Sequence, residues 1–338
     1  MTSQSPNPLV SAVIIHSGKP QFLKGCLDSL LSAKGSENIE AIVVDNCSQT
    51  PDLEELIALY RNVRLVHLAK RSGYPTSTNA GIRVSTGKYL LWCNDDLVFD
   101  ASAVQLLADF LESHPDYGAA APRLLNPDGS YQPSFSLIHI SLVPLILERL
   151  YLSRLFPSQV IALNSNGREM IEQDVAVGTG ACLLIRREAL KQIGDGIDER
   201  FFIYSEEFDL CHCLFKAGWK VRYLPSACVT HFGGQTTTKT ERSRIFMVQS
   251  WRSNYAYIRK HYGDLAETVL AFFVVVTAVP RICVGLGRQI AGVITANQGC
   301  AKSGREQRQF HCYLLRLSLT AGRHQASVLP ELERSPWS

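Results

Sequence analysis

The sequence predicts an α/β protein built on a doubly wound, mostly parallel sheet with helices on both faces, followed by a helical C-terminal extension. Strand-like and helix-like segments alternate four times within the first hundred residues, as in sheets assembled from β-α-β units. The strand-like segments are continuous apolar runs, which is typical of strands covered on both faces. After residue 240 only helical patterns follow.

The composition is that of a globular protein. The chain has 338 residues, of which 46% are hydrophobic and 19% charged, enough for a large core in one or two domains. A formal net charge of +3 is too small to indicate nucleic-acid binding. The ten cysteines are scattered, lack zinc-site spacing and follow no secretory signal. We therefore expect a reducing, cytoplasmic compartment.

Residues 9–100 contain the repeated strand–helix units. Phe22, Cys26 and Leu30 recur with helical spacing, which predicts an amphipathic helix. Pro51 and the acids after it favour the start of a second helix. We expect strands at 9–16, 39–44, 63–68 and 89–93, and helices at 21–33, 51–60 and 76–85.

Polar residues follow two of these strands directly, at the sheet edge where open α/β proteins bind ligands. Asn94, Asp95 and Asp96 follow the fourth strand; they form either a turn or a site for Mg²⁺ or Mn²⁺ that also holds substrate phosphates. Asp45 follows the second strand and either caps the next loop or binds a nucleotide. The glycine signatures of dinucleotide-binding and P-loop proteins are missing, which argues against both classes.

Residues 101–240 continue with mixed elements. The segment 126–129 (NPDG) has the residue types of a tight turn. The apolar segment 137–152 is either a core helix or a flap over the site. We expect helices at 101–113 and 205–217, and strands at 117–122, 175–185, 221–224 and 227–231.

Three polar residues in this half have two interpretations each. Glu206 and Glu207 lie in the first turn of a predicted helix, where they either stabilise the helix start or provide a general base. His231 ends a predicted strand and is either a satisfied structural residue or a third metal ligand.

Residues 241–325 are predicted to be helical and basic. Seven Lys or Arg stand against one acid between residues 281 and 325, and the uninterrupted apolar run 269–280 has twelve residues, fewer than the ~20 that span a bilayer. The region either docks on an anionic membrane surface or forms a bundle packed on the preceding domain. We expect disordered ends at 1–8 and 326–338, and a domain at 9–240 divided near residue 100 into two halves.

Seven motifs occur in a fixed order along the chain: VVDNCS (43–48), RSGYPTSTNAG (71–81), NDD (94–96), APRLLNPDG (121–129), GTGA (178–181), FIYSEEFDLC (202–211) and HFGGQT (231–236). In this order they resemble the inverting nucleotide-sugar glycosyltransferases of family 2, particularly the rhamnosyltransferase-like branch, over residues 9–263. The resemblance implies a GT-A fold, with a nucleotide-sugar half at about 9–100 and an acceptor half at about 101–240, and a metal-dependent enzyme. Such an enzyme moves one sugar from a nucleotide-diphosphate donor to a glycan or lipid-linked acceptor in cell-surface polysaccharide synthesis.

The resemblance also implies roles for individual residues. Glu207 would be the catalytic base, and Asp96, with Asp95 and His231, would bind Mg²⁺ or Mn²⁺. The donor-binding residues would be Asp45, Asn46, Ser48, Gly73, Asn79, Asn94 and Asp95, and the acceptor-side residues Arg123, Gly180, Glu206 and Asp209.

The chain departs from the family pattern at several positions. His16-Ser17-Gly18 replaces the usual TYN, Arg71 replaces Asn, and Glu207 replaces the catalytic Asp. Ser253 follows Gln249–Arg252 where processive synthases carry Trp, which indicates transfer of a single sugar.

The implied partners are dTDP-rhamnose as the favoured donor, a polyprenyl-diphosphate-linked acceptor and an anionic membrane surface, without nucleic acid. The implied location is the cytoplasm, peripheral on the inner face of the plasma membrane. The alternative is a non-catalytic, nucleotide-sugar-binding scaffold of the same fold, but a decayed enzyme would be expected to lose Asp96 or Glu207, and both carboxylates are present. The oligomeric state stays open.

Overall fold

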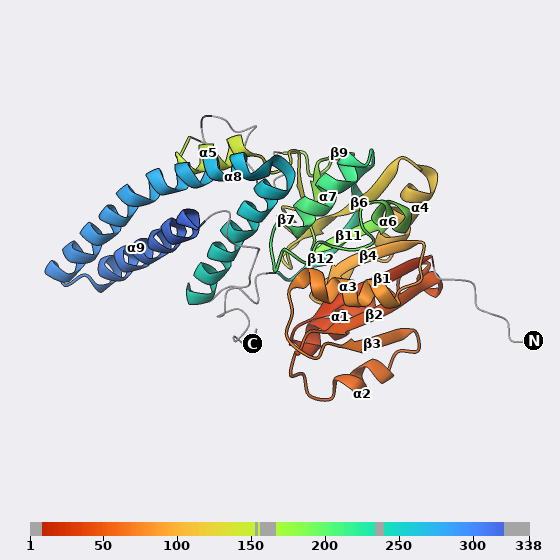
Figure 1. Cartoon of the computed structure of the whole chain (residues 1–338). Helices are drawn as coiled ribbons and strands as arrows, with labels where there is room; N and C mark the ends of the chain where they lie inside the picture. Colours follow the sequence, from red (N-terminus) through yellow and green to blue (C-terminus); the bar gives the residue numbers. More distant parts are fainter. Residues whose placement is uncertain (1–8, 153–154, 156–166, 234–239, 321–338) are drawn as a thin grey trace, which may run out of the picture.

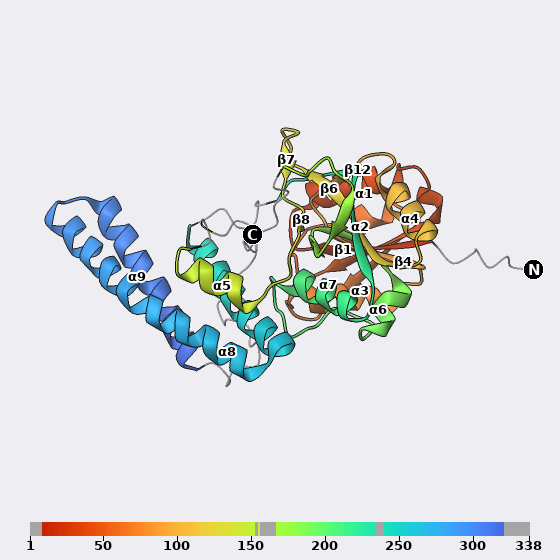
Figure 2. The same ribbon diagram turned by 90° about the horizontal axis from the view of Figure 1, so that it is seen from above.

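The computed structural model describes residues 9–152, 155, 167–233 and 240–320. The expectations for the ends, 1–8 and 326–338, lie outside the described residues. The described chain forms a body around one large sheet, and a helical hairpin projects from it (Figures 1 and 2). The predicted fold class is confirmed.

The large sheet is mixed. Its first four strands run parallel, and β11 inverts the direction between β4 and β6. Short β7 and β9 pair with β6 and β12. The strand order is β3 (Val63–His67), β2 (Ile39–Asp45), β1 (Val10–His16), β4 (Tyr89–Asn94), β11 (Cys182–Arg186), β6 (Tyr117–Leu125), β12 (Lys220–His231) and β5 (Leu97–Phe99).

Helices cover both faces of this sheet, because both faces of its strands are apolar. Along β1, Ala12 and Ile14 enter one core cluster while Val13 and Ile15 enter the other, as the two-residue period of a strand requires. The first cluster contains buried residues of α1 (Pro20–Leu31), α2 (Leu53–Ala58) and α4 (Ala103–Ser113). The second contains those of α3 (Tyr74–Val84), α6 (Arg187–Gln192) and α7 (Glu206–Lys216). A 3₁₀ turn, η1 (Ser36–Asn38), precedes β2.

Two strand predictions in the second half were wrong in their boundaries. The segment 175–185 is not one strand but β9 (Gln173–Val175), β10 (Val177–Gly178) and β11, separated by residues 179–181, which leave the ladder to line a cavity. The segments 221–224 and 227–231 are one strand, β12, with a register shift between Leu224 and Cys228. Pro225 lies in this irregularity, since it has no N–H to donate to the ladder. The small strands β7 (Tyr131–Gln132) and β8 (Phe135–Ser136) complete the body.

The C-terminal extension is a helical hairpin. It consists of α8 (Thr240–Ile294), which bends at Gly263 (φ 87°), and α9 (Gln298–Leu319). The segment 137–152 forms α5 (Leu142–Arg149), which packs on α8. The expectation that the apolar run 269–280 is too short to span a bilayer was wrong. By length and composition alone, α8 contains a stretch long and apolar enough to cross a bilayer, and a third of that stretch is buried.

Candidate active site

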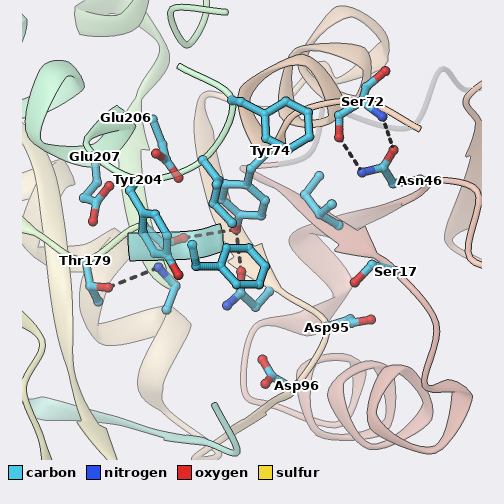
Figure 3. Close-up of a pocket in the computed structure, with 17 residues that line it drawn as sticks. Ser17, Asn46, Ser72, Tyr74, Asp95, Asp96, Thr179, Tyr204, Glu206 and Glu207 are labelled. Carbon is cyan, nitrogen blue, oxygen red and sulfur yellow. Dashed lines mark hydrogen bonds between the residues drawn. The ribbon is translucent and has the colours of Figure 1, made fainter. Parts of the chain in front are cut away.

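A cavity of about 260 Å³ opens at the carboxyl ends of the parallel strands. Ser17 follows β1, Asn46 follows β2, and Asn94–Asp96 connect β4 to β5, so the sheet supplies one wall. Glu206 and Glu207, at the start of α7, supply the opposite wall. Figure 3 shows the two glutamates facing Asn46 and Ser72 across the cavity, with Asp95 and Asp96 at its base. Asp96 and Glu207 therefore line one shared cavity.

Asn46 fixes the sheet-side wall of the cavity. Its buried side chain donates from Nδ2 to the carbonyl of Ser72 (2.9 Å), and its Oδ1 accepts from the amide of Ser72 (2.8 Å). This pair of bonds ties the loop after β2 to the loop before α3 (Figure 3). Asp45 stands one residue behind: its Oδ1 accepts from the amide of Ser48 (2.9 Å), and its Oδ2 lies 3.1 Å from His67 Nδ1. Burial opposes ionisation of Asp45, but these bonds hold its pKa below the usual value.

His16 holds Asp95. The fully buried ring lies with Nδ1 2.6 Å from Oδ2 of Asp95 and Nε2 2.8 Å from Oγ1 of Thr50. Burial raises the pKa of Asp95, and the contact with His16 opposes that rise. The sequence revealed His16 only as a departure from a family pattern, whereas the structure gives it a definite contact.

Asp96 and His231 bring together two groups suited to a cation. Nε2 of His231 lies 3.2 Å from Oδ1 of Asp96 and 3.3 Å from Nδ2 of Asn94. Oδ1 of Asp96 is buried and has no hydrogen-bond partner within the described part of the chain. A buried carboxylate oxygen without a partner, beside an imidazole nitrogen, is a donor set that fits Mg²⁺ or Mn²⁺. Tyr74 supports the cluster because its hydroxyl donates to Oδ1 of Asn94 (2.5 Å).

The two glutamates follow a strained turn. Tyr204 and Ser205 both have positive φ, 69° and 68°, a conformation that costs free energy in residues with side chains. Glu206 is buried, and its Oε2 has no hydrogen-bond partner among the described residues. Burial and the charge of Glu207 raise the pKa of Glu206 well above its usual value, and burial raises the pKa of Glu207 to about 7.

Gly180 lies against this pair. A Cβ at residue 180 would stand 3.2 Å from Cη2 of Trp92 and 3.4 Å from Cβ of Glu207. There is therefore little space for a side chain at this point, and glycine lets the backbone approach the carboxylate.

Several predicted site residues lie outside the described lining of the cavity. Asn79 donates to the carbonyl of Ile197 and to Glu199 (2.8 Å each). Asp209 lies 2.7 Å from both Lys260 and His261 of α8. The remaining five outside it are Asp45, Ser48, Gly73, Arg123 and His231. Of these, Arg123 contacts the sulfur atoms of Met170 and Cys228, and His231 contacts the lining residues Asn94 and Asp96.

Ten lining residues were not among the predicted site residues: Ile15, Ser17, Ser72, Tyr74, Thr179, Ala181, Phe202, Ile203, Tyr204 and Phe246. Tyr74 and Tyr204 stand inside recognised motifs, so their position could have indicated a role. Phe246 comes from α8, and no local pattern signals its contact with the cavity.

The match to the model named glycosyl transferase family 2 covers residues 11–194, and the chain belongs to this family. It is an inverting glycosyltransferase with a GT-A fold. A Mycobacterium tuberculosis protein named N-acetylglucosaminyl-diphospho-decaprenol L-rhamnosyltransferase is 30% identical over 251 residues, which are 69% of this chain and 79% of that protein. The O-antigen biosynthesis protein RfbC of Myxococcus xanthus is 28% identical over 60% of this chain and 16% of its own length.

Solved structures agree on the fold. A mannosyltransferase from Pyrobaculum calidifontis, solved in complex with GDP-Man and Mn²⁺, matches with a TM-score of 0.54 at 14% identity, over 94% of this chain and 88% of its own. GalNAc-T7, solved with UDP, GalNAc and Mn²⁺, matches with a TM-score of 0.50 at 14% identity, over 73% of this chain and 50% of its own.

Proposed function

We propose that this enzyme transfers a single rhamnose-type sugar from a nucleotide-diphosphate donor to a lipid-linked glycan acceptor, with a divalent cation at Asp96. One observation carries the proposal: Asp96 and Glu207 line the same cavity from different walls. A cation-binding carboxylate and a proton-accepting carboxylate on one cavity are the two groups that inverting transfer from a diphosphate donor needs.

The sheet wall holds the donor. Asn46 and Ser17 line the side where the strand ends would receive the nucleotide, and Asp45 and Ser48 support that loop from behind. Asp96, with Asp95 and His231, would hold Mg²⁺ or Mn²⁺. When bound, the cation neutralises the charge that develops on the departing diphosphate.

Glu207 accepts the proton. The acceptor hydroxyl oxygen forms a bond to the anomeric carbon from the face opposite the diphosphate, the bond from that carbon to the diphosphate oxygen breaks, and Glu207 takes the hydroxyl proton. A pKa of about 7 suits this role, because a base poised near the working pH is both ionised and able to hold a proton. Gly180 and Glu206 line the cavity next to Glu207, on the side proposed for the acceptor.

The name of the Mycobacterium tuberculosis relative supports rhamnose as the sugar and a diphospho-polyprenol-linked N-acetylglucosamine as the acceptor. dTDP-rhamnose is the donor that we favour. The reaction then belongs to cell-surface polysaccharide synthesis.

The hairpin supports a membrane location. Six exposed apolar side chains of α8 recur at separations of three, four or seven residues and so share one face: Phe272, Val276, Val279, Leu286, Ile290 and Val293. Arg288 on α8 and Lys302 and Arg305 on α9 are exposed nearby in the hairpin. An apolar face with a cationic surplus suits peripheral binding to an anionic inner leaflet.

The catalytic proposal is tested by incubating the full-length protein with a panel of nucleotide sugars, with and without Mn²⁺, and measuring binding and slow hydrolysis. We expect Mn²⁺-dependent binding that is tightest for dTDP-rhamnose, and transfer to a synthetic diphospholipid-linked N-acetylglucosamine. Equal binding of all nucleotide sugars regardless of Mn²⁺ would contradict the proposal.

The membrane proposal is tested by co-sedimentation with vesicles. Vesicles of phosphatidylglycerol and phosphatidylcholine should retain the protein better than vesicles of phosphatidylcholine alone. Phe272→Glu combined with Leu286→Glu should abolish retention, whereas Leu59→Glu, at a 71% exposed leucine beside α2, is the matched control. Retention of the double variant at the wild-type level would exclude this face as the membrane contact.

A further inference from the structure

The second nitrogen of the His231 ring has a dedicated partner. Nδ1 lies 2.6 Å from Oε1 of Gln132. The other hydrogen bonds of the Gln132 amide fix the same orientation, with Oε1 toward His231 Nδ1. Its Nε2 donates to Oδ1 of Asn126 (3.0 Å) and to the carbonyl of His231 (3.4 Å). Because Oε1 can only accept, Nδ1 of His231 carries a proton.

We infer that Gln132 is a positioning residue that fixes the tautomer of His231, so that Nε2 is presented unprotonated to a cation shared with Asp96. Two further contacts agree. Nε2 accepts from Nδ2 of Asn94 (3.3 Å), and Oδ1 of Asp96, only 3.2 Å away, has no hydrogen-bond partner in the described ranges. A protonated Nε2 would donate to that oxygen; a lone pair on Nε2 leaves both atoms available to a metal.

The turn at 126–129 thereby acquires a role. Gly129 (φ 82°) and the bond from its amide to the carbonyl of Asn126 (2.9 Å) close the turn. The chain then returns as β7, which places Gln132 opposite Leu124 of β6, one strand away from β12 and His231. Asn126 is itself fixed, because its Nδ2 donates to Oγ of Ser130 (2.9 Å). The turn therefore holds the Gln132 side chain in position, and Gln132 in turn fixes the orientation of the His231 ring.

The inference rests on the proposed cation site, and a spectroscopic test separates the two. In the metal-free, full-length protein labelled with ¹⁵N-histidine, NMR should show His231 protonated at Nδ1 and not at Nε2. Gln132→Leu removes the acceptor and should move the proton to Nε2. Gln132→Glu keeps an acceptor and should retain the Nδ1-protonated form.

Mn²⁺ affinity, measured by titration calorimetry in the presence of dTDP, gives the second readout. Removing the hydrogen-bond partner of a metal-binding histidine typically weakens metal binding roughly 10–100-fold, so we expect that loss in Gln132→Leu and near-complete recovery in Gln132→Glu. In a His231→Ala background, Gln132→Leu should cause no further loss.

The two ways to fail are distinct. An unchanged tautomer and unchanged Mn²⁺ affinity in a folded Gln132→Leu protein would overturn the role of Gln132. Mn²⁺ binding that is unaffected by His231→Ala, together with the expected tautomer, would overturn the cation site and leave the tautomer assignment intact.

Discussion

The two sides of the cavity hold their carboxylates in different ways. Behind the sheet wall, Asp45 accepts hydrogen bonds and its pKa is lowered despite burial; on that wall, burial raises the pKa of Asp95, and the contact with His16 opposes this rise. On the helix wall, Oε2 of Glu206 has no hydrogen-bond partner among the described residues, and the pKa values of Glu206 and Glu207 are raised by burial.

The difference separates binding from chemistry. Carboxylates that accept hydrogen bonds stay ionised and keep a fixed geometry, which suits a nucleotide or a cation. A carboxylate whose pKa burial raises to about 7, as in Glu207, suits proton transfer. We therefore propose that the same type of side chain serves two purposes in this site, according to the element that carries it.

The largest effect is expected from Glu207→Gln, because it removes the proposed base and keeps the side-chain volume. General-base catalysis contributes about 10²–10⁴-fold, so the single-turnover rate should fall by that order while the donor affinity measured by calorimetry stays unchanged. Glu206→Gln is the comparison: it removes the neighbouring carboxylate, whose pKa burial raises well above its usual value, and it should lower the rate less than Glu207→Gln does. Equal losses in the two variants would contradict the division of roles between them.

Asp96→Ala should affect binding instead of the proton transfer. Loss of this proposed metal ligand should weaken Mn²⁺ and dTDP binding together, by at least the roughly 10–100-fold that is typical when a hydrogen-bond partner of a metal ligand is removed. Asp100→Ala is the control, since Asp100 is an exposed acid just after β5. The metal assignment would fail if calorimetry gave the same dTDP affinity for Asp96→Ala and the wild type in the presence of Mn²⁺.

The sheet wall could be predicted from sequence because its signals are local. An apolar strand that ends in polar residues places them at the ligand-binding edge, so Asn94, Asp95 and Asp96 follow directly from the pattern of β4. Local composition was sufficient in this case.

Residues whose partners lie far along the chain could not be placed in this way. Asn79 turns to a loop near Ile197, over a hundred residues away. Asp209 follows Glu207 by two positions, which at 3.6 residues per turn puts it on the opposite side of α7, next to Lys260. Phe246 reaches the cavity only because α8 packs there. A motif fixes neighbours in sequence, whereas these contacts depend on how helices pack.

The pH dependence of the rate should follow the ionisation of Glu207 on the helix wall. Because Glu207 must be ionised to accept a proton and burial raises its pKa to about 7, kcat/KM should fall about tenfold per pH unit below that value. The measurement is kcat/KM between pH 5.5 and 8.5 at saturating Mn²⁺. A profile that stays flat down to pH 5.5 would mean that the pKa of Glu207 is not raised to about 7.

The smallest expected effect is on the free energy of unfolding, through the raised pKa of Glu206 on the helix wall. A carboxyl group whose pKa is raised in the folded state stays protonated there, whereas in the unfolded chain it ionises above its ordinary pKa of about 4.3. Its stabilising contribution is therefore fully present below that pH and is lost as the pH rises toward the folded-state value.

Glu206→Gln removes the titration, so its unfolding free energy, measured with urea, should exceed that of the wild type by roughly 1–3 kcal/mol at pH 8. The two proteins should converge near pH 4.5, and Glu55→Gln on the exposed side of α2 should show no such divergence. If the curves of the wild type and Glu206→Gln ran parallel across this range, Glu206 would be ionised in the folded protein, and the contrast between the two walls would reduce to Glu207 alone.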